Sequence, residues 1–379
     1  MAASQIPAGG VRRIAIAGPG VRSLARMRGA LVRELLRRRH RVLLVAPEMP
    51  ASDAARLTEL GAEVRSWTWK RSTLAFLARR AATASARRLL AEWEPHPLLA
   101  SGAGTMEPLL AASGRKGRVV ALVNDLAAFP GAEKGWPSLR ATLAHAGAAV
   151  FHNHDDRDRL AAAGAIAPDL VTTVVPGAGV DLAHFAASPL PPIAGGIVFA
   201  CLAPLAPRRG VREFCEAARQ VKERAPTARF LLAGPPVPAS GFSQKDLERY
   251  AGAVEYLGPL DDVRPVLEAC HVVVYPSHGE GMPRTVLEAM GVGRAVVTTE
   301  TPGCRETVDD RVSGCLVPPC DVAALAGAME SLLKRPDLIA AMSRAARAKA
   351  ERRFSEASVV ANLLPLLGVE ERRGSEPAG

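Results

Sequence analysis

Residues 254–290 read VEYLGPLDDVRPVLEACHVVVYPSHGEGMPRTVLEAM and hold the pattern that best indicates the fold. Within this stretch, His271–Tyr275 is an apolar run with the length of a buried strand. A glycine-containing loop follows, and residues 284–292 then have the composition of a helix. A strand that leads through a loop into a helix is the repeating unit of a parallel sheet covered by helices.

The same alternation extends in both directions from this stretch. Before the proline-rich joint Pro189–Pro192, we expect strands near residues 12–17, 41–46, 63–67, 119–123, 148–151 and 171–175. After the joint, we expect strands near residues 196–201, 229–233, 254–257, 272–275, 295–298 and 314–317. The last long helical stretch, 339–367, has a break near 353–355. Two doubly wound α/β domains are therefore predicted.

The predicted division of the chain follows from this joint and this break. Residues 11–188 are expected to form an N-terminal Rossmann-like domain. Residues 193–352 are expected to form a C-terminal Rossmann-like domain, and 353–371 a helix that packs back toward the first domain.

The composition is that of a soluble globular protein, with 48% hydrophobic and 23% charged residues among 379. No apolar run has the length of a membrane span and no signal peptide is evident, so a cytoplasmic location is expected. The six cysteines include no CxxC pair, so we expect reduced thiols, no metal site and no cofactor. Gly18-Pro19-Gly20 lacks the dinucleotide fingerprint GxGxxG, which argues against a dehydrogenase.

The positive charge of the chain is concentrated near its start. Residues 1–91 hold 18 Lys/Arg and 5 Asp/Glu, a net charge of +13, whereas the remainder has a net charge of −3. Such a segment attracts an anionic membrane surface or a lipid diphosphate. Nucleic acid is not expected as a partner, because aromatic residues make up only 4% and no binding module accompanies the arginines. A solvated arginine-rich surface is the alternative explanation.

Residues Ser277–Met290 have the chemistry of a phosphate and sugar site. Glycines let a backbone approach a ligand closely, and the unpaired N–H groups at a helix start favour phosphate. Glu280 lies in the loop and Glu288 in the helix that follows, and each carboxylate can accept hydrogen bonds from a diol. The alternative is that both glutamates are solvated surface residues.

This segment resembles the E-x7-E motif of retaining glycosyltransferases of family 4, which have the GT-B fold. Residues 254–277, Thr301–Glu306 and Ser313–Pro318 resemble the segments around that motif, and Phe151–Arg157 and Val175–Asp181 resemble the end of the N-terminal domain. The resemblance is strong from about residue 146 to 360. It is greatest to the branch that acts on UDP-N-acetylhexosamines and lipid-linked acceptors. It implies two facing Rossmann-like domains with a central cleft, in which residues 11–188 form the acceptor side and residues 193–352 bind the nucleotide sugar.

The resemblance also implies roles for individual residues. Glu280 would contact the donor sugar and Glu288 the ribose, while Arg209 would hold the diphosphate. Catalytic roles are expected for Glu280, Arg209, Asn124 and Asp125. Donor binding is expected for Gly18, Gly20, Arg208, Arg209, Tyr256, Leu257, Gly258, His278, Gly279, Glu280, Gly281, Met282, Pro283, Arg284, Thr285 and Glu288.

Two departures from the family pattern affect this expectation. Pro204 stands where the family usually has an arginine, and proline has no donor to offer a phosphate. Arg208 or Arg284 would have to compensate. Many relatives also have a histidine in the segment aligned with Leu122–Phe129, whereas this chain has Asn124 and Asp125. These two residues either position the acceptor or cap the following turn.

The implied activity is a metal-independent, retaining transfer of a hexose or N-acetylhexosamine from a UDP-sugar. The acceptor would be a saccharide, expected to be lipid-linked, in cell-envelope polysaccharide synthesis. The basic N-terminal segment would then contact the inner face of the cell membrane, with Arg33, Arg37, Arg38 and Arg41 as candidate contacts. The alternative is a GT-B protein with weak or no transferase activity that acts as a binding or partner subunit.

Overall fold

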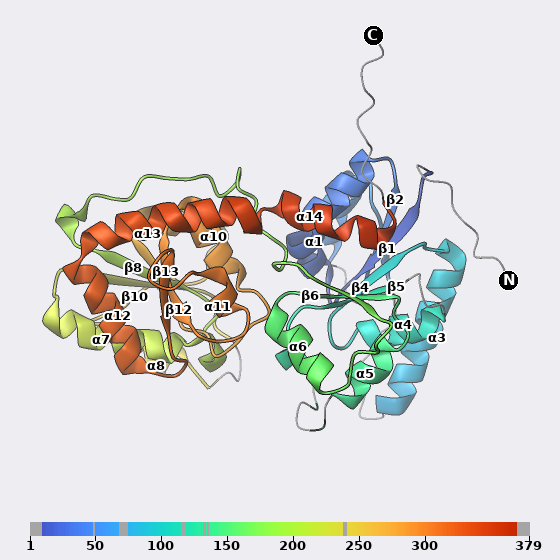
Figure 1. Cartoon of the computed structure of the whole chain (residues 1–379), viewed down its shortest axis with the longest axis horizontal. Coiled ribbons are helices and arrows are strands. Elements are labelled where there is room, and N and C mark those ends of the chain that lie inside the picture. The colour runs from blue at the N-terminus through green and yellow to red at the C-terminus, as the bar shows by residue number, and fades with distance from the viewer. Residues whose placement is uncertain are drawn as a thin grey trace, which may run out of the picture. The chain divides into compact units, whose positions relative to one another are not determined.

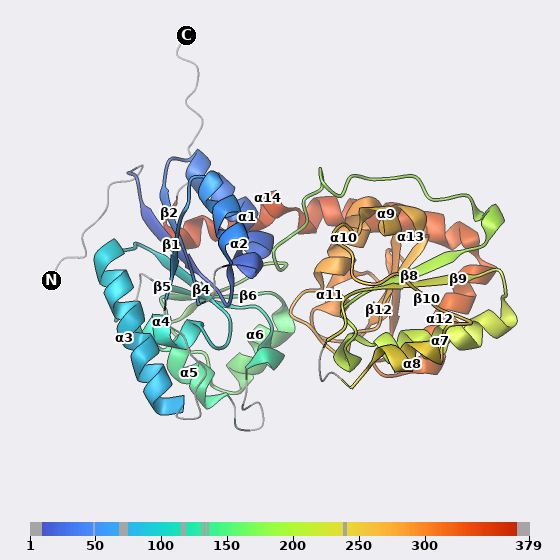
Figure 2. The same ribbon diagram turned by 180° about the vertical axis from the view of Figure 1, so that it is seen from behind.

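The computed structural model describes residues 10–47, 50–67, 75–114, 119–129, 131, 134, 136–237 and 241–369. The chain divides into two compact units (Figures 1 and 2). Unit 1 comprises residues 1–178 and 357–379, and unit 2 comprises residues 179–356. No helix among the described residues is long and apolar enough to cross a membrane.

Unit 1 is built on a seven-stranded parallel sheet of order β3-β2-β1-β4-β5-β6-β7. Its strands are β1 Arg13–Ala17, β2 Arg41–Ala46, β3 Glu63–Ser66, β4 Leu98–Ser101, β5 Val119–Val123, β6 Ala148–Phe151 and β7 Val171–Val174. The helices in residues 1–178 of this unit are α1 Val21–Arg37, α2 Ala51–Glu59, α3 Ala75–Trp93, α4 Met106–Ser113, α5 Pro137–Leu143 and α6 His154–Ala162.

The two faces of this sheet are buried by different helices. Alternate side chains of β1 point to opposite faces, so Ile14 and Ile16 belong to one apolar cluster and Ala15 and Ala17 to another. The first cluster also contains residues of α1, and the second contains residues of α3, α4 and α5. Figures 1 and 2 show α1 and α3 on opposite sides of the sheet.

Strand β4 was missing from the expected elements, although it lies at the centre of the unit 1 sheet between β1 and β5. Only four residues form it, and Pro95 and Pro97 immediately precede it. Prolines interrupt the sequence pattern of a central strand, because they cannot donate a ladder hydrogen bond. The strand nevertheless pairs along its whole length with β5, and all four of its side chains are buried.

Unit 2 is built on a six-stranded parallel sheet of order β10-β9-β8-β11-β12-β13. Its strands are β8 Val198–Leu202, β9 Arg229–Ala233, β10 Glu255–Tyr256, β11 Val272–Tyr275, β12 Ala295–Thr299 and β13 Gly314–Val317. Its helices are α7 Val211–Arg224, α8 Gln244–Glu248, α9 Arg264–Ala269, α10 Arg284–Val292, α11 Cys304–Thr307, α12 Val322–Lys334 and α13 Pro336–Lys349.

Both faces of the unit 2 sheet are covered by helices. Helices α10 and α13 lie on one side of the sheet, and α7 and α12 lie on the other (Figures 1 and 2). Helix α10 contacts α13, while α7 contacts α12. The predicted fold class is therefore confirmed: the chain contains two doubly wound parallel-sheet α/β units.

The first crossing between the units lies ten residues before the predicted boundary at 188. Val180 and Phe185 are buried in the apolar core of unit 2, so residues 179–188 pack there. Arg294 is 0% exposed and donates to the carbonyl oxygens of Ser188 and Pro189 at 2.7 and 3.0 Å. The proline-rich joint therefore belongs to unit 2 and does not act as a free linker.

The chain returns to unit 1 through a short break after α13. A π-helical turn, Ala350–Phe354, follows α13, and helix α14, Glu356–Leu363, begins after the extended residue Ser355. Val359, Val360 and Leu363 of α14 lie in the same apolar cluster as Ile14 and Leu31. The closing segment of the chain is therefore part of the unit 1 core. Residues 370 and 371 of the predicted helical segment lie outside the described residues.

Candidate functional site

The predicted donor-binding residues of unit 2 gather at one edge of its sheet. The strand order changes direction between β8 and β11, and ligands of doubly wound sheets bind beyond the carboxyl ends of the strands at such a point. Arg208 and Arg209 follow β8, and His278–Pro283 follow β11. Residues 256–258 lie at the end of β10, on the same edge.

An arginine, a glutamate and a tyrosine form the centre of this edge. The Arg209 guanidinium makes an ion pair with Glu280, whose side chain is only 14% exposed. The Tyr275 hydroxyl donates to Glu280 Oε2 at 2.9 Å and accepts from Arg209 Nη1 at 3.4 Å. Burial raises the pKa of Tyr275, so the hydroxyl keeps its proton as a donor. The sequence pattern predicted Arg209 and Glu280 but not Tyr275, whose only signal is its position at the end of a buried strand.

Two glycines bring the loops of this edge into backbone contact. Gly210 has φ +71°, and a Cβ there would collide with the carbonyl oxygen of Pro276. Gly303 has φ +75°, and a Cβ there would collide with the carbonyl oxygen of Glu280. Both positions therefore require glycine, and together they hold the Arg209 turn and the 301–303 loop against the segment after β11.

Arg208 and His278 both make polar contacts with other residues of unit 2. Arg208 Nη2 donates to the carbonyl oxygen of Gly279 at 3.1 Å, and the backbone N–H of His278 donates to the carbonyl oxygen of Arg208 at 3.0 Å. The imidazole Nε2 of His278 lies 2.9 Å from Glu213 Oε1 on α7. This contact favours a local structural role for His278 over phosphate binding, which were the two alternatives at the sequence level.

Helix α10 begins at Arg284, directly after Gly281, Met282 and Pro283. Glu288, one turn into the helix, accepts a hydrogen bond from Arg284 Nε at 2.7 Å and is buried. A buried carboxylate that is paired with an arginine can accept further hydrogen bonds from a ligand. Thr285 lies in the first turn, where backbone N–H groups lack helical partners.

The residues expected beside the base lie at the end of β10. The Tyr256 hydroxyl donates to the carbonyl oxygen of Gly234 at 2.8 Å, and Gly234 N–H donates to the carbonyl oxygen of Gly258 at 2.9 Å. Leu257, between them, is 41% exposed. This turn therefore presents an apolar side chain on a hydrogen-bonded frame.

Pro204 is exposed in the loop directly after β8 and offers no donor to a ligand. Arg208, Arg209 and Arg284 follow β8 and β11 and bring positive charge to this edge.

The unit 1 candidates lie at the carboxyl ends of its own strands. Gly18 directly follows β1, and Gly20 is the residue before α1. Both precede the open N-terminus of α1, which suits an anion. Asp125 caps the short 3-10 helix Leu126–Ala128, accepting from the N–H of Ala127 at 3.0 Å, as the capping alternative expected.

Asn124 is bound by an arginine that the sequence did not single out. Arg28 on α1 is 3% exposed and donates to Asn124 Oδ1 at 3.4 Å. The same guanidinium lies 3.2 Å from Nε2 of the buried His152. Burial lowers the pKa of Arg28 to about 10, and burial together with Arg28 lowers the pKa of His152 to about 3. His152 is therefore neutral, and Asn124 belongs to a buried cationic cluster.

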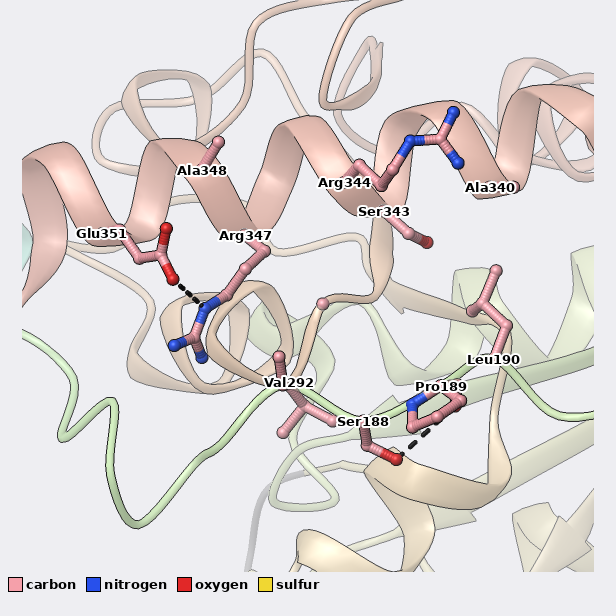
Figure 3. Close-up of a pocket in the computed structure, with 12 residues that line it drawn as sticks. Ser188, Pro189, Leu190, Val292, Ala340, Ser343, Arg344, Arg347, Ala348 and Glu351 are labelled. Atoms are coloured by element: carbon pink, nitrogen blue, oxygen red, sulfur yellow. Dashed lines mark hydrogen bonds and ion pairs between the residues drawn. The ribbon is translucent and has the colours of Figure 1, made fainter.

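A separate cavity of about 400 Å³ lies between α13 and the segment 187–190 (Figure 3). None of the predicted site residues lines it. Arg347, on its wall, pairs with Glu351 at 2.7 Å (Figure 3). Its guanidinium also donates to the carbonyl oxygens of Phe185 and Gly291. Through Phe185, these contacts hold the residues that precede the proline-rich joint to helix α13. The cavity is therefore part of the packing around that joint.

Part of unit 2 is similar in sequence to a known family. Residues 196–335 match the family model described as Glycosyl transferases group 1. An N,N'-diacetylbacillosaminyl-diphospho-undecaprenol alpha-1,3-N-acetylgalactosaminyltransferase of Campylobacter jejuni is 35% identical over 106 residues, 28% of this chain and 27% of the relative. A D-inositol 3-phosphate glycosyltransferase of Saccharomonospora viridis is 33% identical over 230 residues, 55% of this chain and 53% of the relative. The matches thus span from about a quarter to about half of the length of these relatives.

Solved structures resemble the chain over nearly its whole length. Anabaena Alr3699/HepE in complex with UDP has a TM-score of 0.77 at 19% identity, with 95% of this chain and 100% of that chain covered. The apo form of the lipopolysaccharide outer core galactosyltransferase WaaB has a TM-score of 0.70 at 14% identity, with 94% and 99% covered. Residues 196–335 therefore match the glycosyl transferases group 1 family, and the chain as a whole has the GT-B fold of glycosyltransferases.

Proposed function

We propose that this protein is a retaining glycosyltransferase of family 4 that transfers a hexose or N-acetylhexosamine from a UDP-sugar to a lipid-linked saccharide. The group formed by Arg209, Glu280 and Tyr275 at the β8–β11 switch point is the observation that carries this proposal. Its place on the GT-B fold, within the segment that matches the family, supports a role in sugar transfer.

The charges at this edge suit a departing nucleoside diphosphate. When the bond between the anomeric carbon and the diphosphate breaks, negative charge develops on the phosphate oxygens. Arg209, Arg208 and Arg284, with the backbone amides at the start of α10, would stabilise that charge without a metal ion. Glu280 would then hold a hydroxyl of the donor sugar, and Glu288 the ribose diol.

The proposed donor and acceptor take support from similar proteins. The solved structure of Alr3699/HepE that resembles this chain is in complex with UDP. The name of the relative from Campylobacter jejuni includes a diphospho-undecaprenol group. We therefore propose UDP as the nucleotide and a lipid diphosphate saccharide of the cell envelope as the acceptor.

Glu288→Ala is expected to weaken UDP binding by about tenfold to a hundredfold. The ribose would lose a charge-assisted hydrogen bond, worth about 1.5–3 kcal/mol. Calorimetry on the purified chain with UDP, GDP and ADP measures the effect, with UDP expected to bind most tightly. Glu223→Ala, at an exposed glutamate on α7 that pairs with Arg219, is the control and should leave the affinity unchanged.

A wild-type affinity for UDP that Glu288→Ala leaves intact would contradict the position proposed for the ribose. Folded wild-type protein that binds none of the three nucleotides would instead support the second candidate function, a binding or partner subunit without transferase activity. Pro204 is the observation that favours this second function, because it removes a donor where the family has an arginine.

We also propose that unit 1 contacts the inner, cytoplasmic face of the cell membrane through its arginines. Arg37 and Arg38 both pair with Glu34 at 2.7 Å, and Arg41 pairs with Glu63 at 2.6 Å, so three of the four candidate contacts already have an acidic partner. The net charge of residues 1–91 nevertheless stays at +13, because these carboxylates are included in it.

Flotation with vesicles tests the membrane contact. We expect recovery with phosphatidylglycerol vesicles to exceed recovery with phosphatidylcholine vesicles at low salt and to fall as salt screens the charges. Replacing Arg33 and Arg37 together by alanine should lower the affinity for anionic vesicles by about tenfold. Arg219→Ala in unit 2 is the control. Equal recovery with both lipids at low salt would rule out the contact.

A further inference from the structure

Three side chains that commonly bind metal ions converge in unit 2. Glu213 lies in the first turn of α7, His278 in the loop after β11, and Cys320 in the loop between β13 and α12. Their ligand atoms (a carboxylate oxygen, an imidazole nitrogen and the thiol sulfur) all lie within 4.8 Å of one another. They come from three separate segments, so the fold brings them together.

The group is incomplete as a hydrogen-bonded cluster. His278 Nε2 lies 2.9 Å from Glu213 Oε1, but Glu213 Oε2 is buried and has no hydrogen-bond partner in the described part of the chain. A buried carboxylate oxygen without a partner is costly. Cys320 has φ +60°, a left-handed conformation that glycine or asparagine adopts far more easily than cysteine. The thiol is nevertheless held beside the carboxylate and the imidazole.

We propose that Glu213, His278 and Cys320 bind a zinc-like divalent metal ion, with water at the remaining coordination position. Zn²⁺ accepts nitrogen, sulfur and carboxylate ligands in tetrahedral sites, whereas Mg²⁺ and Ca²⁺ prefer oxygen ligands alone. The ion would give Glu213 Oε2 the partner that it lacks. On binding, the thiol loses its proton to the buffer and the thiolate sulfur bonds the metal.

The proposed site can be reached from solvent, because Cys320 is exposed. The sequence predicted no metal site because it has no CxxC pair, and Glu213, His278 and Cys320 are far apart in the chain.

The ion would position the proposed catalytic pair without touching substrate. Glu213 follows Arg209 by four residues, and His278 precedes Glu280 by two. An ion coordinated by both Glu213 and His278 would therefore hold the turn that contains Arg209 against the loop that contains Glu280. This consequence rests on the proposed function, whereas metal binding itself does not.

Titration of the chelator-treated full chain with Co²⁺, in the absence of nucleotide, tests the site. We expect a thiolate-to-cobalt charge-transfer absorption that saturates at one ion per chain and disappears when Zn²⁺ is added. Cys320→Gly should fold, because glycine suits φ +60°, and should lose this absorption. The Zn²⁺ affinity of Cys320→Gly should be about a hundredfold lower than that of the wild type. Substitution of residues that only hydrogen-bond to metal ligands already lowers metal affinity by about tenfold to a hundredfold, and Cys320 is a proposed ligand itself.

Matched substitutions on α7 separate the site from general effects of charge. Glu213→Gln should weaken Co²⁺ binding, whereas Glu216→Gln, on the next turn of α7, should leave it unchanged. Absence of the charge-transfer absorption in the wild type, or its persistence in Cys320→Gly, would overturn the proposal. UDP calorimetry on the same samples distinguishes the two hypotheses, because Co²⁺ binding without UDP binding would refute only the proposed function.

Discussion

Arg209→Ala is expected to lower kcat/KM for transfer or hydrolysis of the UDP-sugar by about a hundredfold to a thousandfold. The guanidinium is the cation that the structure holds in contact with Glu280 and Tyr275 at the β8–β11 switch point. Pro204 supplies no donor at its own position after β8, so Arg208 and Arg284 would have to stabilise the diphosphate charge when Arg209 is lost. Release of UDP from a panel of UDP-hexoses and UDP-N-acetylhexosamines measures the effect.

Two further variants show whether charge or geometry is responsible. Arg209→Lys keeps the charge but not the planar, forked donor set, so it should recover only part of the activity. Arg219→Ala removes an exposed arginine of α7 that pairs with Glu216 and should retain full activity. If Arg209→Ala stays within about threefold of wild type, the charge of Arg209 does not contribute to the step as proposed.

Arg294→Met is expected to lower the free energy of unfolding of unit 2 by about 3–5 kcal/mol. The buried guanidinium has no carboxylate partner among the described residues and instead donates to six backbone carbonyl oxygens at 2.7–3.3 Å. Burial lowers its pKa, yet the group stays charged at neutral pH. Methionine would remove these six hydrogen bonds, including those to Ser188 and Pro189, so we expect unfolding at lower urea concentrations.

Arg344→Met on α13 is the control for this loss of stability. Arg344 is an exposed arginine on the wall of the cavity beside the joint (Figure 3), so its replacement should change the free energy of unfolding by less than about 0.5 kcal/mol. An Arg294→Met chain that loses less than about 1 kcal/mol would show that the joint is held mainly by Val180 and Phe185.

Local patterns predicted most elements of unit 2. The helix expected at residues 284–292 has those bounds in the structure, because a glycine-rich loop precedes it and Gly293 in the left-handed conformation ends it. Strand β11 was expected from its apolar run alone. The break near 353–355 is also present, at Ser355. In each case the signal lies within a few neighbouring residues.

Features that depend on distant residues were not predictable in this way. Strand β4 is short and preceded by prolines, and only its partners β1 and β5 make it a central strand. The joint at Pro189–Pro192 reads as a linker, although Arg294, more than a hundred residues later, binds it to unit 2. Tyr275 gives no signal beyond its position at the end of a buried strand, and Arg28 gives none, because their roles arise from the contacts with Glu280 and Asn124.

The return of the chain to unit 1 also determines the order in which the two units can be completed on the ribosome. During translation, β1 and α1 emerge from the ribosome first. Helix α14, which covers part of their apolar cluster, emerges only after residues 179–356. Unit 2 is continuous in sequence and can finish folding while Ile14 and Leu31 still lack the helix that buries them. A chain truncated before α14 would therefore contain a folded unit 2 joined to a unit 1 with exposed apolar surface. We expect that unit 1 to aggregate unless chaperones bind it.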